Sequence, residues 1–363
     1  MSCDICEGID PNLSNVANGK RLGVSEATIR RHRAAPHTDP FFTDIPVDII
    51  TSRGRTVRLP DGSYEKVTYS PAKYAVMEAV KYDDLAHLID APVPAPTHRT
   101  RPHAAVLNVA DLQIGKGKQR GGGTEDTIRR TKESVAKFIE HVKETVPQTI
   151  VIVDNGDAME GIFSGGGGQA YTNDRTLLEQ FRIVRHLFAW IIREVAQHAP
   201  EIVVVAVPSN HGEVRAAHHI RAGSIDDDFG LEVNRILEER FEDSKHIKFV
   251  RPEPLYGTAV VQVAGTKLAF NHGHHTKGGQ NNHDKWWAAQ DHGRMPGWDA
   301  DILVVAHYHN LKIEQSGDGR WIISCSAGET SSDWFTDSHG QQAKRGLTGF
   351  DVSGGEWFNL RIY

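Results

Sequence analysis

Short runs of branched hydrophobic residues, each followed by polar residues, recur along the chain beyond residue 103. The run 149–153 is followed by Asp-Asn-Gly-Asp, and comparable runs lie at 104–110, 202–207, 258–263, 267–271 and 302–306. Such runs predict buried strands, and the longer amphipathic segments between them predict helices near 125–146, 174–198 and 228–241. Strands that alternate with helices are typical of a layered α/β domain, which we expect over residues 103–363.

The N-terminal part of the chain has a different pattern. Residues 13–35 predict two short helices separated by a Gly-containing turn, with Ser25 in position to cap the second helix. This unit, residues 1–40, resembles the helix-turn-helix of DNA-binding regulators. The resemblance implies that Arg30, Arg31 and Arg33 contact nucleic acid. A small helical hairpin with a solvated basic face is the alternative interpretation.

Residues 41–90 predict a small unit of strands and one helix. Strand-like runs lie at 47–51, 56–59 and 64–69, and an amphipathic segment follows at 71–89. The stretch 91–102 is rich in proline, which predicts a stiff linker before the α/β domain at 103–363. We therefore expect a small helical and β N-terminal domain ahead of the larger α/β domain.

Composition narrows the class of protein. The 363 residues are 39% hydrophobic and 24% charged, as in ordinary globular proteins, and the net charge of −6 leaves nucleic-acid contact to a local basic patch. Three cysteines are too few for a disulfide framework, and for the isolated Cys3 and Cys6 pair free thiols are favoured over a zinc site. Without a signal peptide or a long apolar run, a cytoplasmic location and no membrane partner are expected. Homo-oligomer formation stays open.

Metal-capable side chains follow five of the predicted strands, at the rim of the sheet where α/β proteins bind ligands. They are Asp111, Gln113, Asp157, Asn210, His272, His307 and His309. Mixed carboxylate, amide and imidazole ligands suit manganese or iron better than a thiolate-loving metal. A carboxylate such as Asp157 can bridge two ions roughly 3.5–4 Å apart, which lowers the pKa of a shared water. Alternatively, Asp111 and Asp157 each cap a helix.

Taken in order, these residues resemble the calcineurin-like metallophosphoesterase superfamily over about residues 103–330. That family has the blocks D-x-H, G-D, G-N-H-D/E, H and G-H-x-H. Here they read Asp111-Leu112-Gln113, Gly156-Asp157, Asn210-His211-Gly212-Glu213, His272 and His307-Tyr308-His309. The resemblance implies a β-sandwich core flanked by helices and two divalent ions, most naturally Mn²⁺, with Fe, Zn or Mg as alternatives.

The resemblance also implies a role for each site residue. One metal ion is expected on Asp111, Gln113, Asp157 and His309, and the other on Asp157, Asn210, His272 and His307. His211 is expected to act as general acid to the leaving oxygen or to contact the phosphate. Gln113 stands where the family has histidine, which weakens the first site. His272 fits the pattern better than His274, and Glu213 is displaced by Gly212 and receives no role.

Two further features have competing interpretations. The loop 115–118 contains two lysines but lacks the sequence of a phosphate-binding P-loop, so it predicts a mobile basic rim. Contact of this rim with a substrate backbone stays open. Trp286 and Trp287 lie in a helix-like stretch, so at most one faces the core. For these tryptophans, packing is favoured over stacking on a base.

The expected function is a dinuclear-metal phosphoesterase in which a metal-bound hydroxide attacks phosphorus. The N-terminal unit favours a phosphodiesterase or nuclease acting on nucleic acid, and the arrangement resembles phage-encoded members related to the DNA-repair nuclease branch. One alternative is hydrolysis of small phosphoesters, such as cyclic nucleotides, or of phosphoproteins. The other is a DNA-binding regulator whose phosphoesterase domain is inactive because Gln113 weakens one metal site.

Overall fold

The chain divides into two compact units, Met1–Val80 and Lys81–Tyr363. The computed structural model describes residues 9–10, 12–24, 29, 54–58, 64–68, 93–96, 100–117, 122–162, 172–217, 220–221, 223–317, 319–329 and 343–363. Val93, in the proline-rich stretch, is buried in the larger unit, and its N–H donates to Ser244 Oγ at 3.0 Å. The boundaries expected at residues 40, 90 and 102 stay predictions.

In the smaller unit, the first predicted helix is α2 (Asn15–Leu22). Ser14 caps its start by accepting the Ala17 N–H, and Gly23 ends it in the left-handed conformation. A hairpin of β1 (Gly54–Arg58) and β2 (Tyr64–Thr68) matches the second and third predicted strands of this unit. Most of the second predicted helix lies outside the described residues, as do Arg30, Arg31 and Arg33. The nucleic-acid role therefore stays a prediction.

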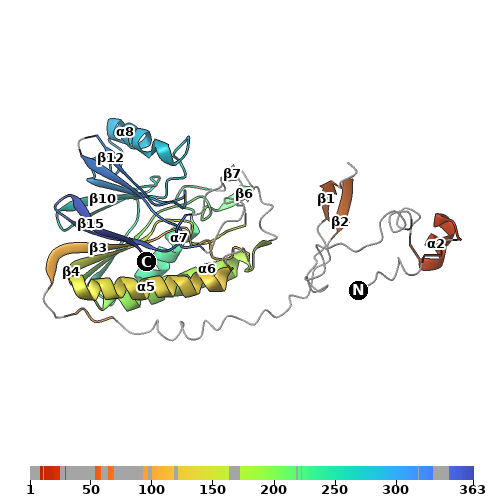
Figure 1. The fold of residues 1–363 in the computed structure, drawn as a ribbon, viewed down its shortest axis with the longest axis horizontal. Coiled ribbons are helices and arrows are strands. Elements are labelled where there is room, and N and C mark those ends of the chain that lie inside the picture. The colour runs from red at the N-terminus through yellow and green to blue at the C-terminus, as the bar shows by residue number, and fades with distance from the viewer. Residues whose placement is uncertain are drawn as a thin grey trace. The chain divides into compact units, whose positions relative to one another are not determined.

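The larger unit contains a six-stranded and a five-stranded sheet (Figure 1). In the six-stranded sheet the strand order is β15-β14-β3-β4-β5-β8. The neighbouring strands β3, β4, β5 and β8 are parallel, and β14 and β15 are added antiparallel at one edge. Its strands are β3 (Arg101–Val109), β4 (Pro147–Asp154), β5 (Glu201–Ala206), β8 (Ile247–Val250), β14 (Thr348–Ser353) and β15 (Glu356–Ile362).

The five-stranded sheet has the order β12-β13-β11-β10-β9. Its three central strands are parallel, and β9 and β12 are antiparallel edges. The strands are β9 (Ala259–Val263), β10 (Thr266–Asn271), β11 (Ile302–Val305), β12 (Lys312–Ser316) and β13 (Arg320–Ser324). A separate short hairpin joins β6 (Arg215–Ala217) to β7 (Ile220–Arg221).

Helices cover the outer faces of both sheets (Figure 1). On the six-stranded sheet lie α5 (Thr124–Thr145), α6 (Leu177–Ala196) and α7 (Phe229–Arg240), and on the five-stranded sheet lies α8 (His283–Gly293), preceded by the 3-10 helix η5 (Gln280–Asn282). Thr176 and Glu179 form a capping box at the start of α6, and Asp228 caps α7 through the N–H groups of Gly230 and Leu231.

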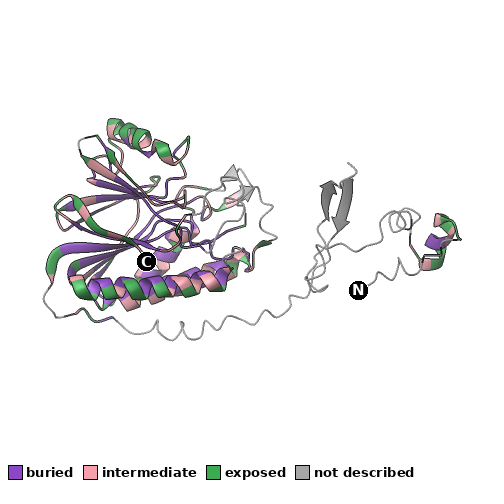
Figure 2. Ribbon diagram, in the orientation of Figure 1, coloured by how far each residue is buried: buried purple, intermediate pink, exposed green. Residues whose placement is uncertain are grey.

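The hydrophobic core lies in three layers because the central strands are buried on both faces (Figure 2). In β4, Ile150 and Ile152 face the helices, whereas Val151 and Val153 face the other sheet. A third layer packs Trp287 of α8 against the five-stranded sheet, with Trp286 only partly buried. This helix–sheet–sheet–helix arrangement confirms the predicted layered fold class with its β-sandwich core.

The predicted strands and helices of the larger unit correspond to β3, β4, β5, β9, β10 and β11 and to α5, α6 and α7. The sequence prediction omitted β8, and it did not reveal that β14 returns to pair with β3. Register with a distant strand is a tertiary property, which periodicity cannot report. None of the helices in the described ranges is long and apolar enough to cross a membrane.

Candidate metal centre

The polar residues that follow five strands meet at one edge of the sandwich. β3, β4 and β5 run parallel in one sheet and β10 and β11 run parallel in the other. The segments beyond β3 and β4 continue side by side, since Asp111 N–H donates to Gly156 O at 3.0 Å and Gln113 N–H donates to Asp157 O at 2.9 Å. Backbone pairing therefore extends past the strands and fixes the spacing of the side chains that follow.

Several candidate residues have an unusual backbone conformation. Asp111, Gln113, Asp157, His307 and His309 all have positive φ, between 45° and 68°. Residues with a Cβ rarely adopt this region, and such strain persists where surrounding contacts enforce it, often at functional sites. Five instances at one edge therefore mark this edge as the functional part of the fold.

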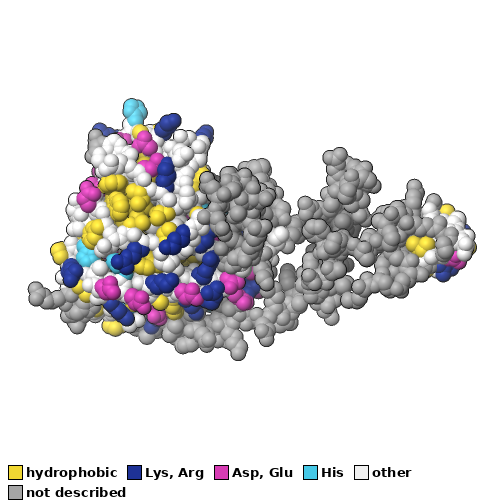
Figure 3. Space-filling view, viewed as in Figure 1, with side chains coloured by type: hydrophobic (Ala, Val, Ile, Leu, Met, Phe, Trp, Pro, Cys, Tyr) yellow, Lys and Arg dark blue, Asp and Glu magenta, His cyan; other side chains and the backbone are white. Residues whose placement is uncertain are grey.

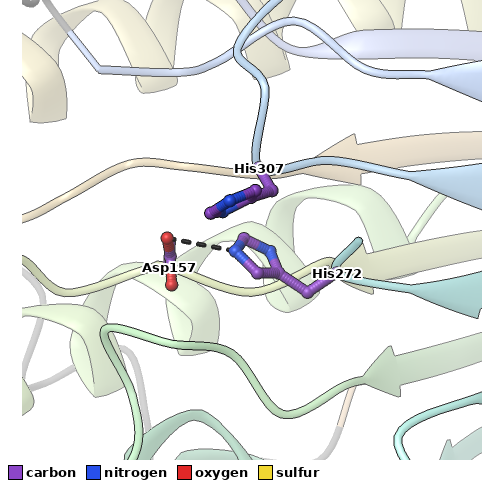
Figure 4. A group of neighbouring side chains, drawn as sticks. All are labelled: Asp157, His272 and His307. Carbon is purple, nitrogen blue, oxygen red and sulfur yellow. Dashed lines mark ion pairs between the residues drawn. The ribbon is translucent and has the colours of Figure 1, made fainter. Parts of the chain in front are cut away.

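The centre of the site is formed by Asp157, His272 and His307, which approach one another from β4, β10 and β11 (Figure 4). One ligand atom from each lies within 4.8 Å of the others. His272 Nε2 is 3.1 Å from Asp157 Oδ2 and 3.1 Å from the side-chain oxygen of Asn210. His272 Nδ1 lies 2.8 Å from the carbonyl oxygen of Asn155, which fixes the ring with Nε2 toward the carboxylate.

A second set of donors adjoins the first. His309 Nε2 is 3.2 Å from Asp111 Oδ1, and Asp111 Oδ2 accepts the His307 N–H at 3.2 Å. Gln113 lies on the same segment as Asp111, and its Oε1 accepts a hydrogen bond from Lys116 Nζ at 2.7 Å. Asp111 and His309 therefore form a second donor set, linked through the His307 N–H to the three-residue centre, and the division of the predicted ligands between two ions stays a prediction.

Glu329 was absent from the sequence prediction. Its carboxylate is 1% exposed and lies 2.7 Å from His309 Nδ1, so it orients the imidazole whose other nitrogen faces Asp111. Lys116, expected on a basic rim, instead contacts this carboxylate, and Arg345 Nη1 lies 3.3 Å from it. Glu329 follows β13 in no recognisable motif, so no local signal in the sequence could have identified it.

The charges of these groups depend on one another. Burial by itself raises the pKa of Asp157, but the adjacent imidazoles of His211, His272 and His307 hold it well below its usual value. Burial lowers the pKa of His272, yet the carboxylates of Asp157 and Asp111 raise it to about 9. His307 has less compensation, and burial lowers its pKa to about 4.

The pKa values of His309 and Glu329 show the same balance between burial and neighbouring charge. Burial lowers the pKa of His309, but Asp111 and Glu329 raise it to about 10. Burial raises the pKa of Glu329, yet His309, Lys116 and Arg345 together lower it to about 2. Positive charge thus accompanies these buried carboxylates when no cation is bound, as expected of groups that otherwise hold a metal ion.

His211 lies beside the centre, as the family resemblance implies. The backbone N–H of His211 donates to Asp157 Oδ1 at 2.9 Å, and the ring Nδ1 lies 2.9 Å from the carbonyl oxygen of Glu160. Its Nε2 is 3.8 Å from Asp157 Oδ2. Asp228 holds the preceding loop by accepting the Ser209 N–H at 2.9 Å. The ring is therefore fixed with Nε2 toward the site.

The remaining histidines differ in position. His274 is half-buried and lies outside the three-residue centre, with its ring 5.4 Å from that of His272, and neither of its nitrogens has a hydrogen-bond partner among the described residues. His283 is fully buried, with its ring 5.4 Å from that of Tyr308. Glu213 pairs with Arg215 at 2.8 Å and contributes to neither donor set.

The residues present fit a divalent cation. Carboxylate, amide and imidazole groups converge from separate strands, and both His272 and His309 have one ring nitrogen tied to an oxygen, which leaves the other for a ligand bond. The donor set contains no thiolate, since Cys325, the cysteine within the described residues, is buried and lies outside the three-residue centre. Together, the two-sheet fold and this centre define the class: an α/β sandwich with a candidate divalent-metal site at its strand ends.

Comparison with known proteins adds the fold context. No family model matches this chain, and no curated protein matches it. Similar solved structures include Vps29 from Entamoeba histolytica complexed with Zn²⁺, with 13% identity over 70% of this chain and 88% of that chain and a TM-score of 0.32. Vps29 from Chaetomium thermophilum has 12% identity over 69% of this chain and 82% of that chain, with a TM-score of 0.31.

A third similar structure is a conserved protein from Streptococcus pneumoniae described as a predicted phosphoesterase. It has 11% identity over 69% of this chain and 84% of that chain, with a TM-score of 0.29. Identities and TM-scores this low carry no argument about activity. The function therefore has to be argued from the centre itself.

Replacing Gly156 tests the packing of the centre. A Cβ at Gly156 would lie 2.5 Å from His272 Nδ1, and φ is 93°, so Gly156→Ala is expected to displace His272. Loss of such support typically lowers metal affinity by about 10–100-fold, measurable by calorimetric titration with Mn²⁺. The control is Gly317→Ala, because nothing lies within 4 Å of a Cβ there. Unchanged affinity in Gly156→Ala would contradict this geometry.

The raised histidine pKa values predict a pH dependence of the metal-free protein. The pKa values of His272 and His309 rise from 6.5 to about 9 and about 10 on folding. Their stabilising contribution is thus complete below the unfolded pKa and is lost as the pH rises through the folded values. In the presence of a chelator, the melting temperature is expected to fall as the pH rises from about 6.5 to about 10. The fall is expected to be smaller in His309→Gln. An equal fall in both proteins would argue against the ion pairs of His309.

Proposed function

We propose that this protein is a divalent-metal-dependent phosphoester hydrolase. The observation that carries the proposal is the convergence of two adjoining donor sets, around Asp157 and around Asp111, with His211 beside them. An isolated carboxylate at a strand end has many structural uses. Buried carboxylates and imidazoles that converge from both sheets have few, and binding cations is the main one.

Within this proposal each residue has a chemical task. Divalent cations bound here would neutralise phosphate oxygens and lower the pKa of a water molecule. Asp157 is proposed to serve both donor sets. His211, with Nδ1 against the Glu160 carbonyl, is proposed to give a proton from Nε2 to the leaving oxygen. We propose two ions, with Mn²⁺ as the natural metal and Fe, Zn or Mg as alternatives.

We further propose a phosphodiesterase or nuclease acting on nucleic acid. The support is the sequence of the N-terminal unit, with Arg30, Arg31 and Arg33 as the contacting side chains. The face of the larger unit in Figure 3 carries basic and acidic side chains interspersed along α5, rather than a continuous basic surface. The proposal therefore assigns polyanion binding to the N-terminal arginines and not to this face.

One contact favours a second candidate function. Lys116 Nζ donates to Gln113 Oε1, the amide oxygen proposed as a metal ligand. An ammonium group there competes with a cation for the same oxygen, which favours a domain with one weak site. The second candidate is accordingly a nucleic-acid-binding regulator whose phosphoesterase domain is inactive. Turnover decides between the two.

Hydrolysis of bis(p-nitrophenyl) phosphate tests the catalytic proposal. With added Mn²⁺ the full chain is expected to turn over this diester, and Asp157→Asn is expected to abolish activity. His211→Gln is expected to lower kcat by about 10²–10⁴-fold, the usual contribution of a positioned proton donor. The control is His292→Gln, because His292 is exposed on α8 away from the centre. Absence of turnover with Mn²⁺, Fe²⁺, Zn²⁺ and Mg²⁺ would favour the inactive regulator.

The nucleic-acid proposal is tested by separating binding from chemistry. Substituting Arg30, Arg31 and Arg33 together with alanine is expected to weaken gel-shift binding of DNA or RNA and to reduce its salt dependence by about one unit of slope per lost phosphate contact. Turnover of the small diester should not change. A panel of DNA, RNA and small phosphoesters gives the substrate class. Activity on small esters alone would overturn the nuclease proposal.

A further inference from the structure

A cavity of about 120 Å³ opens directly beside His211. His211 and Asn210 form one wall of it. The apolar part of the lining consists of Ile162, Leu177, Val214 and Phe229. The proposed proton donor, His211, and a proposed metal ligand, Asn210, thus belong both to the metal centre and to the lining of this cavity. A substrate group bound in the cavity would therefore lie close to the reacting phosphorus.

The apolar wall is built on the protein core. Leu177 and Phe229 begin α6 and α7 and pack against the helix-side core, and the ring of Phe229 lies 5.9 Å from that of Phe181. Val214 and Ile162 lie nearer the opening, where they are 37% and 36% exposed. The wall therefore has a fixed inner part and a rim that solvent reaches.

The charged residues of the cavity are already paired. Arg215 Nε donates to Glu213 Oε2 at 2.8 Å, and Arg215 Nη2 donates to the carbonyl oxygen of Asn210 at 2.8 Å. The pair adds no net charge to the cavity. It also ties the cavity wall to the backbone of Asn210. A charged occupant would gain nothing from this wall, whereas an uncharged apolar group would gain from leaving water.

We propose that this cavity receives a single unpaired aromatic ring carried on the leaving-group side of the phosphoester. The proposal rests on the proposed phosphoester hydrolysis and narrows its substrate class. The size supports one ring, since cavities of roughly 150 Å³ lined by Leu, Ile and Phe bind benzene and whole-ligand pockets are several times larger. The position supports the leaving group, because the ring would lie on the side where His211 Nε2 delivers its proton.

Two kinds of substrate carry such a ring. One is an aryl ester of phosphate, and the other is a nucleotide whose base is free of its partner strand. A base stacked and paired in a duplex cannot enter a cavity of this size without being unpaired and unstacked, which costs binding free energy. The cavity therefore favours single-stranded ends or small esters over intact duplex.

Binding of non-hydrolysable analogues tests the cavity without turnover. The full chain is titrated calorimetrically in Mn²⁺ with benzylphosphonate and, separately, with ethylphosphonate. In both compounds a methylene replaces the ester oxygen, so neither can be hydrolysed. The ring should make benzylphosphonate bind about tenfold more tightly. Val214→Trp would fill the cavity from its rim and should reduce this ratio to about one, and Phe229→Ala should reduce it as well.

The matched control is Leu178→Trp, which adds the same side chain at a 65% exposed position that does not line the cavity. This variant should keep the tenfold ratio. Equal affinities for the two phosphonates in the wild-type chain, or no measurable binding of either, would overturn the proposal. So would a ratio that Val214→Trp leaves unchanged. A preference for benzylphosphonate without turnover of any ester would instead refute the hydrolase and leave the ring site in place.

Hydrolysis separates the two sources of the ring. Single-stranded oligonucleotides that differ only in whether the terminal nucleotide carries a base are compared in the wild-type chain and in Val214→Trp. A dependence on the terminal base that Val214→Trp removes supports a nucleobase in the cavity. A dependence on Val214 for aryl esters alone supports a small ester. Equal rates with and without the ring for both substrates would contradict the proposal.

Discussion

The arrangement at the strand ends depends on the burial of the Asp157 carboxylate. Only 2% of this residue is exposed, and a buried carboxylate without compensation destabilises a fold by several kcal/mol. Compensation comes from the imidazoles of His211, His272 and His307, which belong to three separate segments and both sheets. The two sheets are thereby joined at this edge by charge as well as by the apolar layer between them.

This electrostatic constraint accounts for the strained backbone around it. Five site residues adopt positive φ, which is unfavourable for residues with a Cβ, and the conformation persists because strand ends, hydrogen bonds and ion pairs leave no alternative. Gly156 is needed for a related reason, since His272 occupies the space that a side chain would fill. Backbone strain is thus concentrated at the residues that position the donor groups, as in preorganised sites.

The two donor sets are not equivalent. Around Asp157, the ligand-type nitrogen of His272 faces the carboxylate and no lysine intervenes among the described contacts. Around Asp111, Lys116 contacts both Gln113 and Glu329, so a lysine shares the oxygen atoms that a cation would use. This asymmetry follows from glutamine at position 113, whose amide oxygen accepts from an ammonium group, and it bears on whether the proposed centre would hold one ion or two.

The sequence alone determined six strands of the larger unit, the helices α5, α6 and α7 and the polar residues that follow five of the strands, because burial and periodicity are written locally. The site residues could be predicted as a group, since parallel strands deliver their ends to the same edge. Only the tertiary structure decided the pairing of β14 with β3, the contact of Glu329 with His309, and the cavity between Phe229 and His211. These depend on register and packing between segments far apart in the chain, which no local pattern encodes.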